Sequence, residues 1–519
     1  MNEQAITVVQ WAILFAHYSL LAGLSAYGAH RLYHLLFLGP WTREDRSWAA
    51  ESSAQEEDFR PKVTVQLPIF NEKYVVERLL EKVAELDWPA DRLQIQLVDD
   101  SNDETSAIAS RKIRELAATG IEVEHVRRAD RIGYKAGGLD HAMKTATGEF
   151  IAIFDADFLP NSDFLKQTIP CFQSEGIGMV QTRWSYLNRQ RNLLTRIQAL
   201  MLDAHFAVEQ VIRSRSGAFF NFNGTGGVWR RTAIEDAGGW QSDTLTEDMD
   251  LSYRAQLLGW RFEYLEHIEC PSELPTTMPA FKAQQHRWAK GAIEVMKKVL
   301  PSIWKSDHSL HIKVESTFHL TGNICYLLML IDCVLFLVPS IHIRQNSEFA
   351  YWLWLDIPLF VFASLSHGLY YLYGQHRLGS GILQRMALMP AVFATSIGLC
   401  VNNSRAVIEA LLGQVSAFVR TPKSGDLSEV EKARSIARLS DYPALTARGA
   451  DRLEFVLSLI FFGFVLMFAL RGWWLGALFL APFCAGFFYT FLQGRMIHRA
   501  GKELATIEDE VLQTDEVIL

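Results

Sequence analysis

Residues 150–157 read FIAIFDAD, a short hydrophobic run that ends in two carboxylates separated by one alanine. The run has the length and composition of a strand buried in a parallel sheet. Ligands of open α/β sheets bind outside the carboxyl ends of the strands, so Asp155 and Asp157 stand where a ligand is expected. Carboxylates at such a place suit Mg²⁺ or Mn²⁺, which also binds substrate phosphates. The spacing alone is a weak indication, because acids after strands also cap helices.

The same alternation precedes this stretch. Residues 62–67 (KVTVQL) and 93–98 (LQIQLV) predict strands, and the second is followed by Asp99 and Asp100. Apolar residues at helical spacing fill 77–86, between the two strands. This rhythm predicts a mainly parallel, Rossmann-like α/β sheet covered by helices. The acids that follow separate strands would then meet at one edge of the sheet.

Apolar segments flank the α/β region. Residues 8–38 begin with an uncharged run long enough to span a bilayer, and they lack the features of a cleaved signal peptide. Basic residues after this run place residue 46 onward in the cytoplasm by the positive-inside rule. Four further spans are predicted, at about 316–341, 350–374, 453–471 and 473–494. Residues 382–412 include a shorter apolar run and predict a helix lying at the cytoplasmic face.

These segments predict a multi-pass integral membrane protein of the plasma or inner membrane, with five spans and a cytoplasmic soluble domain. The expected units are an anchor, the α/β domain, an interfacial segment, two transmembrane helices, an interfacial helix with a loop, two more transmembrane helices, and a cytoplasmic tail. Their expected bounds are 1–45, 46–300, 301–312, 313–376, 377–450, 451–495 and 496–519.

Composition excludes several other classes of protein. The 519 residues carry 50 Lys and Arg against 58 Asp and Glu, a net charge of −8, so no basic domain for nucleic acid is expected. The six cysteines form no C-x-x-C pair, which argues against zinc or redox motifs as a main theme. The lipid bilayer, and no nucleic acid, is the expected macromolecular environment.

Three more motifs lie between the DAD stretch and the second apolar region. Thr246-Glu247-Asp248 precedes an expected helix start, where its acids could be either a general base or helix caps. Residues 284–288 (QQHRW) combine an arginine suited to phosphate oxygens with an indole suited to a sugar ring, and an amphipathic helix near the bilayer is the alternative. Residues 223–227 (NGTGG) form either a plain turn or a loop that lets backbone approach a ligand.

The order DDS, DAD, TED and QQHRW resembles that of the family 2 glycosyltransferases, and specifically of their processive, membrane-embedded synthases. The flanking apolar segments are similar to those of cellulose synthase and of the cellulose-synthase-like mannan and glucan synthases. The resemblance implies a GT-A domain joined to an α-helical transmembrane bundle. It also implies a processive, inverting, metal-dependent hexosyltransferase that uses UDP-glucose or GDP-mannose. The expected product is a β-linked glucan or mannan that is translocated across the membrane.

The resemblance also implies roles for individual residues. Asp248 would be the catalytic base, and Asp157, with Asp155, would bind the Mg²⁺ or Mn²⁺ ion. The nucleotide sugar would contact Glu72, Asp100, Lys135, Asp155 and Arg287. The growing polysaccharide acceptor would contact Glu247, Trp288, Gln284, Asn223, Gly224 and Thr225.

A later segment, 418–423 (FVRTPK), is similar to the F-x-V-T-x-K gating loop of cellulose synthase. The resemblance implies gating contacts from Phe418, Thr421 and Lys423. Arg420 departs from that pattern, where valine is expected. Aromatic and polar residues in the spans after 312 predict a path for the polymer that starts at Trp288, with an aromatic belt at the membrane interface as the alternative, above all for Trp352 and Trp354. The residues considered are Tyr326, Phe336, Trp352, Trp354, Tyr370, Tyr371, His319, Asn323 and Ser364.

Two other functions compete with this interpretation. A non-processive glycosyltransferase acting on a lipid acceptor would share the DAD and QQHRW motifs but would need no polymer channel. A transporter with a cytoplasmic regulatory domain would be supported by charges inside the spans, such as Asp332 and Asp356.

Overall fold

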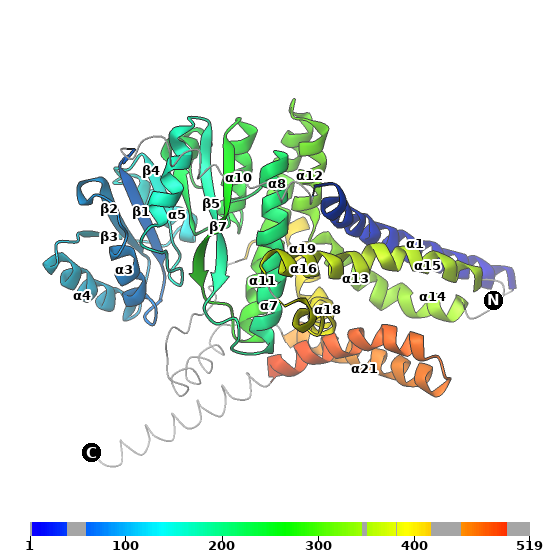
Figure 1. Cartoon of the computed structure of the whole chain (residues 1–519). Helices are drawn as coiled ribbons and strands as arrows, with labels where there is room; N and C mark the ends of the chain where they lie inside the picture. The colour runs from blue at the N-terminus through cyan, green and yellow to red at the C-terminus, as the bar shows by residue number, and fades with distance from the viewer. Residues whose placement is uncertain (1–2, 39–58, 345–349, 380, 417–447, 496–519) are drawn as a thin grey trace, which may run out of the picture.

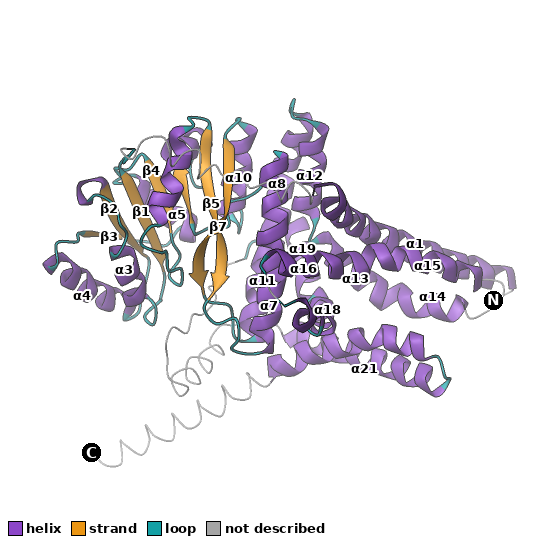
Figure 2. Cartoon of the chain, in the orientation of Figure 1, coloured by secondary structure: helices purple, strands orange, loops and turns teal. Residues whose placement is uncertain are grey.

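The computed structural model describes residues 3–38, 59–344, 350–379, 381–416 and 448–495 (Figure 1). A mixed sheet flanked by helices lies at one end of these residues, and long helices extend away from it at the other end (Figure 2). The sheet and the helices are connected through α11 (Met278–Lys305), which runs along the boundary between them.

The sheet has seven strands in the order β3-β2-β1-β4-β6-β5-β7. Strands β1, β2, β3 and β4 pair in parallel, β5 and β7 pair in parallel, and only β6 runs antiparallel to its neighbours β4 and β5. The mainly parallel α/β sheet expected from the sequence is therefore confirmed. The strand bounds are Val63–Ile69, Leu93–Asp99, Val123–Arg127, Phe150–Ile153, Ile177–Tyr186, Gly227–Arg230 and Arg261–Ser272 for β1 to β7.

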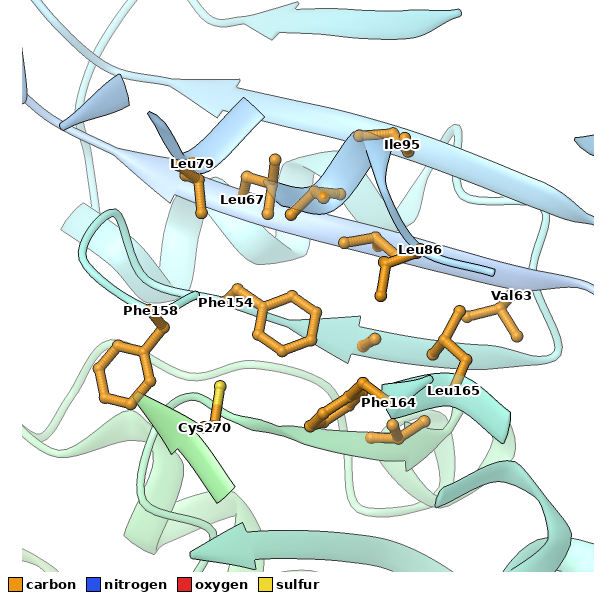
Figure 3. Packing of buried hydrophobic residues seen from close by; sticks show 14 of the residues in the cluster. Val63, Leu67, Leu79, Leu86, Ile95, Phe154, Phe158, Phe164, Leu165 and Cys270 are labelled. Atoms are coloured by element: carbon orange, nitrogen blue, oxygen red, sulfur yellow. The ribbon is translucent and has the colours of Figure 1, made fainter. Parts of the chain in front are cut away.

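Helices cover the sheet because its strands are apolar on both faces. Leu79 of α3 (Val76–Ala84), Leu67 of β1 and Phe154 after β4 belong to one buried cluster (Figure 3). The rings of Phe154 and Phe164 meet edge to face with centroids 4.9 Å apart. The other covering helices are α4 (Thr105–Ala118), α5 (Tyr134–Met143), α6 (Phe164–Thr168), α9 (Arg231–Asp236) and α10 (Glu247–Leu257).

Five helices among the described residues are long and apolar enough to cross a membrane, at Thr7–Phe37, Ile324–Arg344, Trp354–Arg377, Asp451–Leu470 and Trp474–Arg495. Their number and places agree with the five spans predicted from the sequence. The segment expected at the cytoplasmic face forms two helices, Leu383–Gly398 and Cys400–Leu411, bent by 40° to each other. The bend interrupts what would otherwise be a sixth apolar stretch, and an interfacial position for it stays a prediction.

Buried polar contacts join the apolar helices to one another and to the sheet domain. Glu315 of α12 (Leu310–Thr321) accepts hydrogen bonds from His30 and His34 of α1 (Glu3–Tyr33) and its η1 extension, at 2.9 Å each. Arg377, at the end of α16 (Ser366–Arg377), pairs with Glu266 of β7 at 2.6 Å. Lys282 of α11 pairs with the buried Glu454 of α21 (Arg448–Leu470) at 2.7 Å. These contacts fix the helices against the domain at several separate points.

Candidate active site

A cleft with an empty volume of about 1240 Å³ opens beside the carboxyl ends of β1, β2 and β4. Strand ends meet there because the three strands are parallel neighbours. Almost all of the residues singled out in the sequence lie on its wall. They are Glu72, Asp100, Lys135, Asp155, Asp157, Asn223, Gly224, Glu247, Asp248, Gln284, Arg287 and Trp288.

Asp155 lies at the centre of a set of contacts that join three segments. Lys135 of α5 donates a hydrogen bond to its carboxylate at 2.5 Å and another to the carbonyl oxygen of Gly224 at 2.9 Å. The backbone N–H of Asp155 donates to the hydroxyl of Thr225 at 2.8 Å. Thr225 is fully buried behind the cleft wall, so its observed contact is with Asp155, and a direct acceptor contact stays a prediction.

Asp157 is held from the far side of the sheet. Its carboxylate accepts a hydrogen bond at 3.1 Å from the backbone N–H of Glu273, which follows β7. Asp155 and Asp157 offer hard oxygen donors on the same wall, and five further acids line the cleft against three basic residues. This excess of carboxylates fits a divalent cation shared with a diphosphate, and the residues present suit the metal that the sequence implied.

Glu247 and Asp248 form the first turn of α10 and face the cleft. Burial raises the pKa of Asp248, and the neighbouring Glu247 carboxylate raises it further. Burial also raises the pKa of Glu247, which Lys135 partly offsets. Only one carboxylate oxygen of Asp248 is used by its own helix, in a hydrogen bond at 2.8 Å from the N–H of Met249. The geometry therefore allows proton acceptance as well as helix capping.

The backbone of Gly224 passes close to the carboxylate of Asp248. Its φ of +81° lies in the left-handed region, and a Cβ added there would come within 2.9 Å of Asp248 Oδ2. The glycine-rich loop therefore does more than turn the chain. It lets backbone pass directly beside the carboxylate that the resemblance assigns as the base.

The two acids after β2 have different environments. Asp99 is buried, and hydrogen bonds from His125, Ser106 and Ser101 lower its pKa to about 2 despite its burial, so it holds the loop together. Asp100 lines the cleft, but Arg128 already binds both of its oxygens, at 2.7 and 2.5 Å. Asp100 is thus positioned beside the expected nucleotide as part of an ion pair.

Helix α11 brings the QQHRW motif to the opposite wall. Gln284, Arg287 and Trp288 share one helical face and line the cleft, as their spacing requires. Burial lowers the pKa of Arg287, while Glu247 and Asp155 raise it. The guanidinium therefore lies in the field of the same carboxylates that surround the metal position.

Several lining residues carried no motif and were missed in the sequence. Arg131 lies over the ring of Phe70, 3.4 Å from its centroid, at the end of the cleft near Glu72 and Asp100. Trp184 and Tyr186 at the end of β5 face the other end. The two aromatic residues at alternate positions of β5 are the one signal that could have indicated Trp184 and Tyr186.

A second cavity, with an empty volume of about 1470 Å³, adjoins the first. Both cavities have Trp184, Leu202, Asn223, Thr246, Asp248 and Trp288 on their walls. The second extends toward the apolar helices, where Tyr326, Tyr370, Tyr371, His319 and Asn323 line it. These are residues that the sequence indicated for a polymer path. Phe336, Trp352, Trp354 and Ser364, which were considered with them, are not among its lining residues.

The wall of the second cavity carries buried polar atoms that lack partners. Five side-chain atoms there make no hydrogen bond within the part of the chain that the structure describes: Gln198 Oε1, Asn221 Oδ1, Asn223 Nδ2, Thr246 Oγ1 and the Tyr370 hydroxyl. Buried polar groups are normally paired, since an unpaired one costs about 1–3 kcal/mol. The polar side chains that line the cavity beside its aromatic rings fit a ligand rich in hydroxyl groups.

The gating residues implied by the resemblance, Phe418, Thr421 and Lys423, lie outside the described residues, as does Arg420.

The cleft at the strand ends, with its carboxylates and the basic residues beside them, is the candidate active site of the described residues. Residues 61–291 match the family described as "Glycosyltransferase like family 2". The GT-A fold expected for it agrees with the mainly parallel sheet.

Curated relatives place the chain more closely. It is 42% identical over 272 residues to glucomannan 4-beta-mannosyltransferase 2 of Arabidopsis thaliana, which covers 51% of each chain. It is 44% identical over 264 residues to glucomannan 4-beta-mannosyltransferase 1 of Oryza sativa subsp. japonica, 48% of this chain and 51% of that one. The chain spans about half the length of the curated relatives it matches. The suspected resemblance to cellulose-synthase-like synthases is confirmed by these relatives.

Solved structures are more distant. A mannosyltransferase from Pyrobaculum calidifontis, in complex with GDP-Man and Mn²⁺, is 20% identical, with a TM-score of 0.44 over 66% of this chain and 97% of that one. TarS of S. aureus, residues 1–349, is 15% identical, with a TM-score of 0.38 over 69% and 93%.

Proposed function

We propose that this protein is a processive, inverting hexosyltransferase that builds a β-linked polysaccharide and passes it across a membrane. The observation that carries the proposal is the continuity of the two cavities at Asp248 and Trp288. One cavity is acidic and lies at the strand ends, as a nucleotide sugar requires. The other has aromatic rings and unpaired polar atoms and leads toward the apolar helices, as a sugar chain requires.

The donor is assigned to the first cavity. Glu72, Asp100 and the stacked pair of Phe70 and Arg131 surround the end nearest β1 and β2, where the base and ribose would bind. Lys135 and Arg287 would face the diphosphate, because they are the cations nearest the carboxylates of Asp155 and Glu247.

Asp155 and Asp157 would hold a Mg²⁺ or Mn²⁺ ion, which supplies charge neutralisation for the departing diphosphate. Excess chelator should therefore abolish turnover, and added Mg²⁺ or Mn²⁺ should restore it. Full activity in chelator would show that Lys135 and Arg287 alone serve the leaving group.

The reaction proposed at the boundary of the cavities is a single displacement. A hydroxyl of the acceptor sugar attacks the anomeric carbon of an α-linked donor, and the bond from that carbon to the diphosphate breaks. Asp248 accepts the proton of the hydroxyl, for which its raised pKa suits it. Trp288 holds the terminal acceptor ring in place by stacking. One displacement inverts the anomeric centre and gives a β linkage.

Arg31 of α1 is a further residue that would contact the acceptor polysaccharide. Its guanidinium lies over the ring of Tyr370, 4.7 Å from the centroid, and lines the second cavity. Within the described residues Arg31 makes no hydrogen bond or ion pair, so its N–H donors are available to a ligand. Glu209 lies on the same wall, and its carboxylate, which pairs with Arg213 at 3.2 Å, can accept hydrogen bonds. A sugar hydroxyl can accept from Arg31 and donate to Glu209, which fits a neutral, hydroxyl-rich chain.

The sugar is assigned from the relatives. Because the curated relatives are named as β-mannosyltransferases of glucomannan, we assign mannose as the transferred hexose and GDP-mannose as the donor. UDP-glucose, and hence a glucan, is the alternative.

Membranes containing the protein, incubated separately with radiolabelled GDP-mannose and UDP-glucose, test this assignment. We expect a high-molecular-mass product from GDP-mannose that an endo-β-1,4-mannanase degrades and a cellulase does not. Membranes with Asp248→Asn provide the matched control. A product soluble in organic solvent and carrying one sugar would instead identify a lipid-acceptor enzyme, and no sugar release from either donor would contradict the proposal.

A further inference from the structure

The side of α11 that faces away from the cleft carries a second set of polar residues. His286 lies inside the QQHRW motif, yet it does not line either cavity and instead points to α19 (Cys400–Leu411). Lys290 follows it by one helical turn on the same face. The lysine side chain is 0% exposed, which is costly for an ammonium group without partners.

Glu409 of α19 forms ion-pair contacts with both His286 and Lys290. His286 Nε2 lies 3.1 Å from Glu409 Oε2, and Lys290 Nζ lies 3.6 Å from the same oxygen. The other oxygen accepts a hydrogen bond from Arg405 at 2.7 Å, so the carboxylate is held in one orientation by its own helix. Glu409 is therefore a fixed anchor to which two residues of α11 are bound.

The lysines of α11 also contact the last turn of α19 and the segment that follows it. Lys290 donates to the carbonyl oxygen of Gln414 at 2.5 Å and to the hydroxyl of Ser416. Lys297, two turns further along, donates to the carbonyl oxygen of Ala410 at 2.9 Å. Carbonyl groups at a helix C-terminus lack partners within the helix and attract cations. The two helices are thus joined at several places along one line.

This line of contacts determines how α11 is rotated about its axis. Side chains end about 5–6 Å from a helix axis, so a rotation of about 20° would move Arg287 and Trp288 by about 2 Å. Displacements of about 1 Å can cost two orders of magnitude in rate when they affect reacting groups. The contacts of His286 and Lys290 therefore bear directly on where the cleft side of α11 lies.

We propose that Glu409 is a positioning residue for the transfer reaction, which acts by holding His286 and Lys290 and thereby aligning Arg287 and Trp288. The inference rests on the proposed function. The base and ribose end of the donor is assigned to Glu72 and Asp100 on the sheet side of the cleft, whereas Arg287 and Trp288 serve the leaving group and the acceptor. Loss of Glu409 should therefore slow transfer and weaken acceptor use more than it weakens donor binding.

The test compares wild type, Glu409→Gln, Lys290→Met and the double variant in detergent, with kcat and KM measured for donor and for an oligosaccharide primer. We expect Glu409→Gln to lower kcat about tenfold or more and to raise the primer KM, with the donor KM changed less than about threefold. Glu409→Gln leaves the Lys290 ammonium buried without its carboxylate, whereas the double variant removes both. The double variant should therefore be no slower than Glu409→Gln.

Glu235→Gln is the matched control, because Glu235 also pairs with an arginine of its own helix, Arg231, at 2.7 Å, but its side chain is 51% exposed and it lines neither cavity. It should keep near wild-type kinetics. Hydrogen exchange gives a readout that needs no activity: residues 284–290 should exchange faster in Glu409→Gln than in wild type, while β1 and β4 should not.

Each outcome is decisive. Unchanged kcat, primer KM and exchange in Glu409→Gln would overturn the inference, as would a parallel loss of donor binding and thermal stability, which indicates a general structural role. Wild-type protein without any sugar transfer would instead contradict the proposed function, and the exchange measurement would still decide whether Glu409 holds α11.

Discussion

Among single residues, Asp248 has the environment that most clearly distinguishes a general base from a helix cap. It shares a helix start with Glu247, where acids often only stabilise the helix dipole. Burial beside a second carboxylate raises its pKa, which simple capping at a surface would not do. A carboxylate with a raised pKa accepts a proton more readily at neutral pH. The residue is thus matched to the role of base.

Replacement of Asp248 by Asn should abolish transfer and leave donor binding intact. The amide keeps the shape but cannot accept the acceptor proton, so kcat should fall by about 10²–10⁴-fold. The raised pKa means that the ionised carboxylate costs native-state stability at neutral pH, so the variant should unfold at the same or a higher temperature. Calorimetric titration with donor and a turnover assay check both parts. Near-normal turnover would leave Asp248 as a helix cap.

The dependence of kcat on pH should reflect the ionisation of Asp248. Asp248 must be ionised to accept a proton, so kcat should fall as the pH falls through its pKa. Because burial and Glu247 raise that pKa, the fall should begin well above the ordinary value of about 3.9 for aspartate. Below it, the rate should drop about tenfold per pH unit. A kcat that stays constant down to about pH 5 would disagree with the raised pKa.

Gly224 gives a test with an unusually close control. Gly224→Ala and Gly217→Ala both place a side chain at positive φ, +81° and +73°, and should lose similar stability, about 1–2 kcal/mol. Only at Gly224 would the new Cβ meet Asp248 Oδ2, at 2.9 Å, whereas nothing lies within 4 Å at Gly217. We expect a more than tenfold greater loss of kcat for Gly224→Ala. Equal kinetics of the two variants would show that the loop does not position Asp248.

At the scale of helices and strands, the sequence predicted those site residues whose positions depend only on spacing within one segment. Asp155 and Asp157 follow an apolar run, and Gln284, Arg287 and Trp288 are one helical turn apart, so both sets could be assigned before any tertiary contact was known. The partner of Asp100 could not, because Arg128 reaches it from the next strand. Thr225 was expected to contact the acceptor because of its place in the glycine loop, and its buried hydroxyl is seen to accept a hydrogen bond from the backbone N–H of Asp155, a contact that the sequence did not indicate.

Arg31 shows the same limit for whole helices. In the sequence, Arg31 is one of the basic residues after the first apolar run, and it contributed only to the orientation of that span by the positive-inside rule. In the fold, α1 lies beside α16, so Arg31 meets Tyr370 from more than 300 residues away and both line the second cavity. Spacing within one segment carries no information on such a pairing, because it depends on how the helices pack.

The acceptor role of Arg31 predicts a split in kinetic constants. Arg31→Met keeps much of the apolar contact with Tyr370 but removes the donors. A hydrogen bond from a charged group contributes about 1.5–3 kcal/mol, so the primer KM should rise about 10-fold to 100-fold with the donor KM unchanged. Arg114→Met, at an exposed position on α4, serves as the control. An unchanged primer KM would remove Arg31 from the acceptor path.

For the whole molecule, the described residues join a sheet domain that matches a glycosyltransferase family to five helices of membrane-spanning length. The two cavities meet at the boundary between these parts, and the acidic one faces the sheet while the aromatic one faces the helices. Synthesis and passage of the chain would then share Asp248 and Trp288. Each added sugar would push the polymer onward, without a separate transport step.

The central claim is tested most directly with purified protein in sealed proteoliposomes and radiolabelled GDP-mannose in the outer solution. Only molecules whose catalytic domain faces the bath receive donor. The account predicts that polymer accumulates inside the vesicles, protected from an added β-mannanase until detergent opens them, and that Asp248→Asn gives none. Polymer that is made but remains outside and fully digestible would contradict translocation through the second cavity.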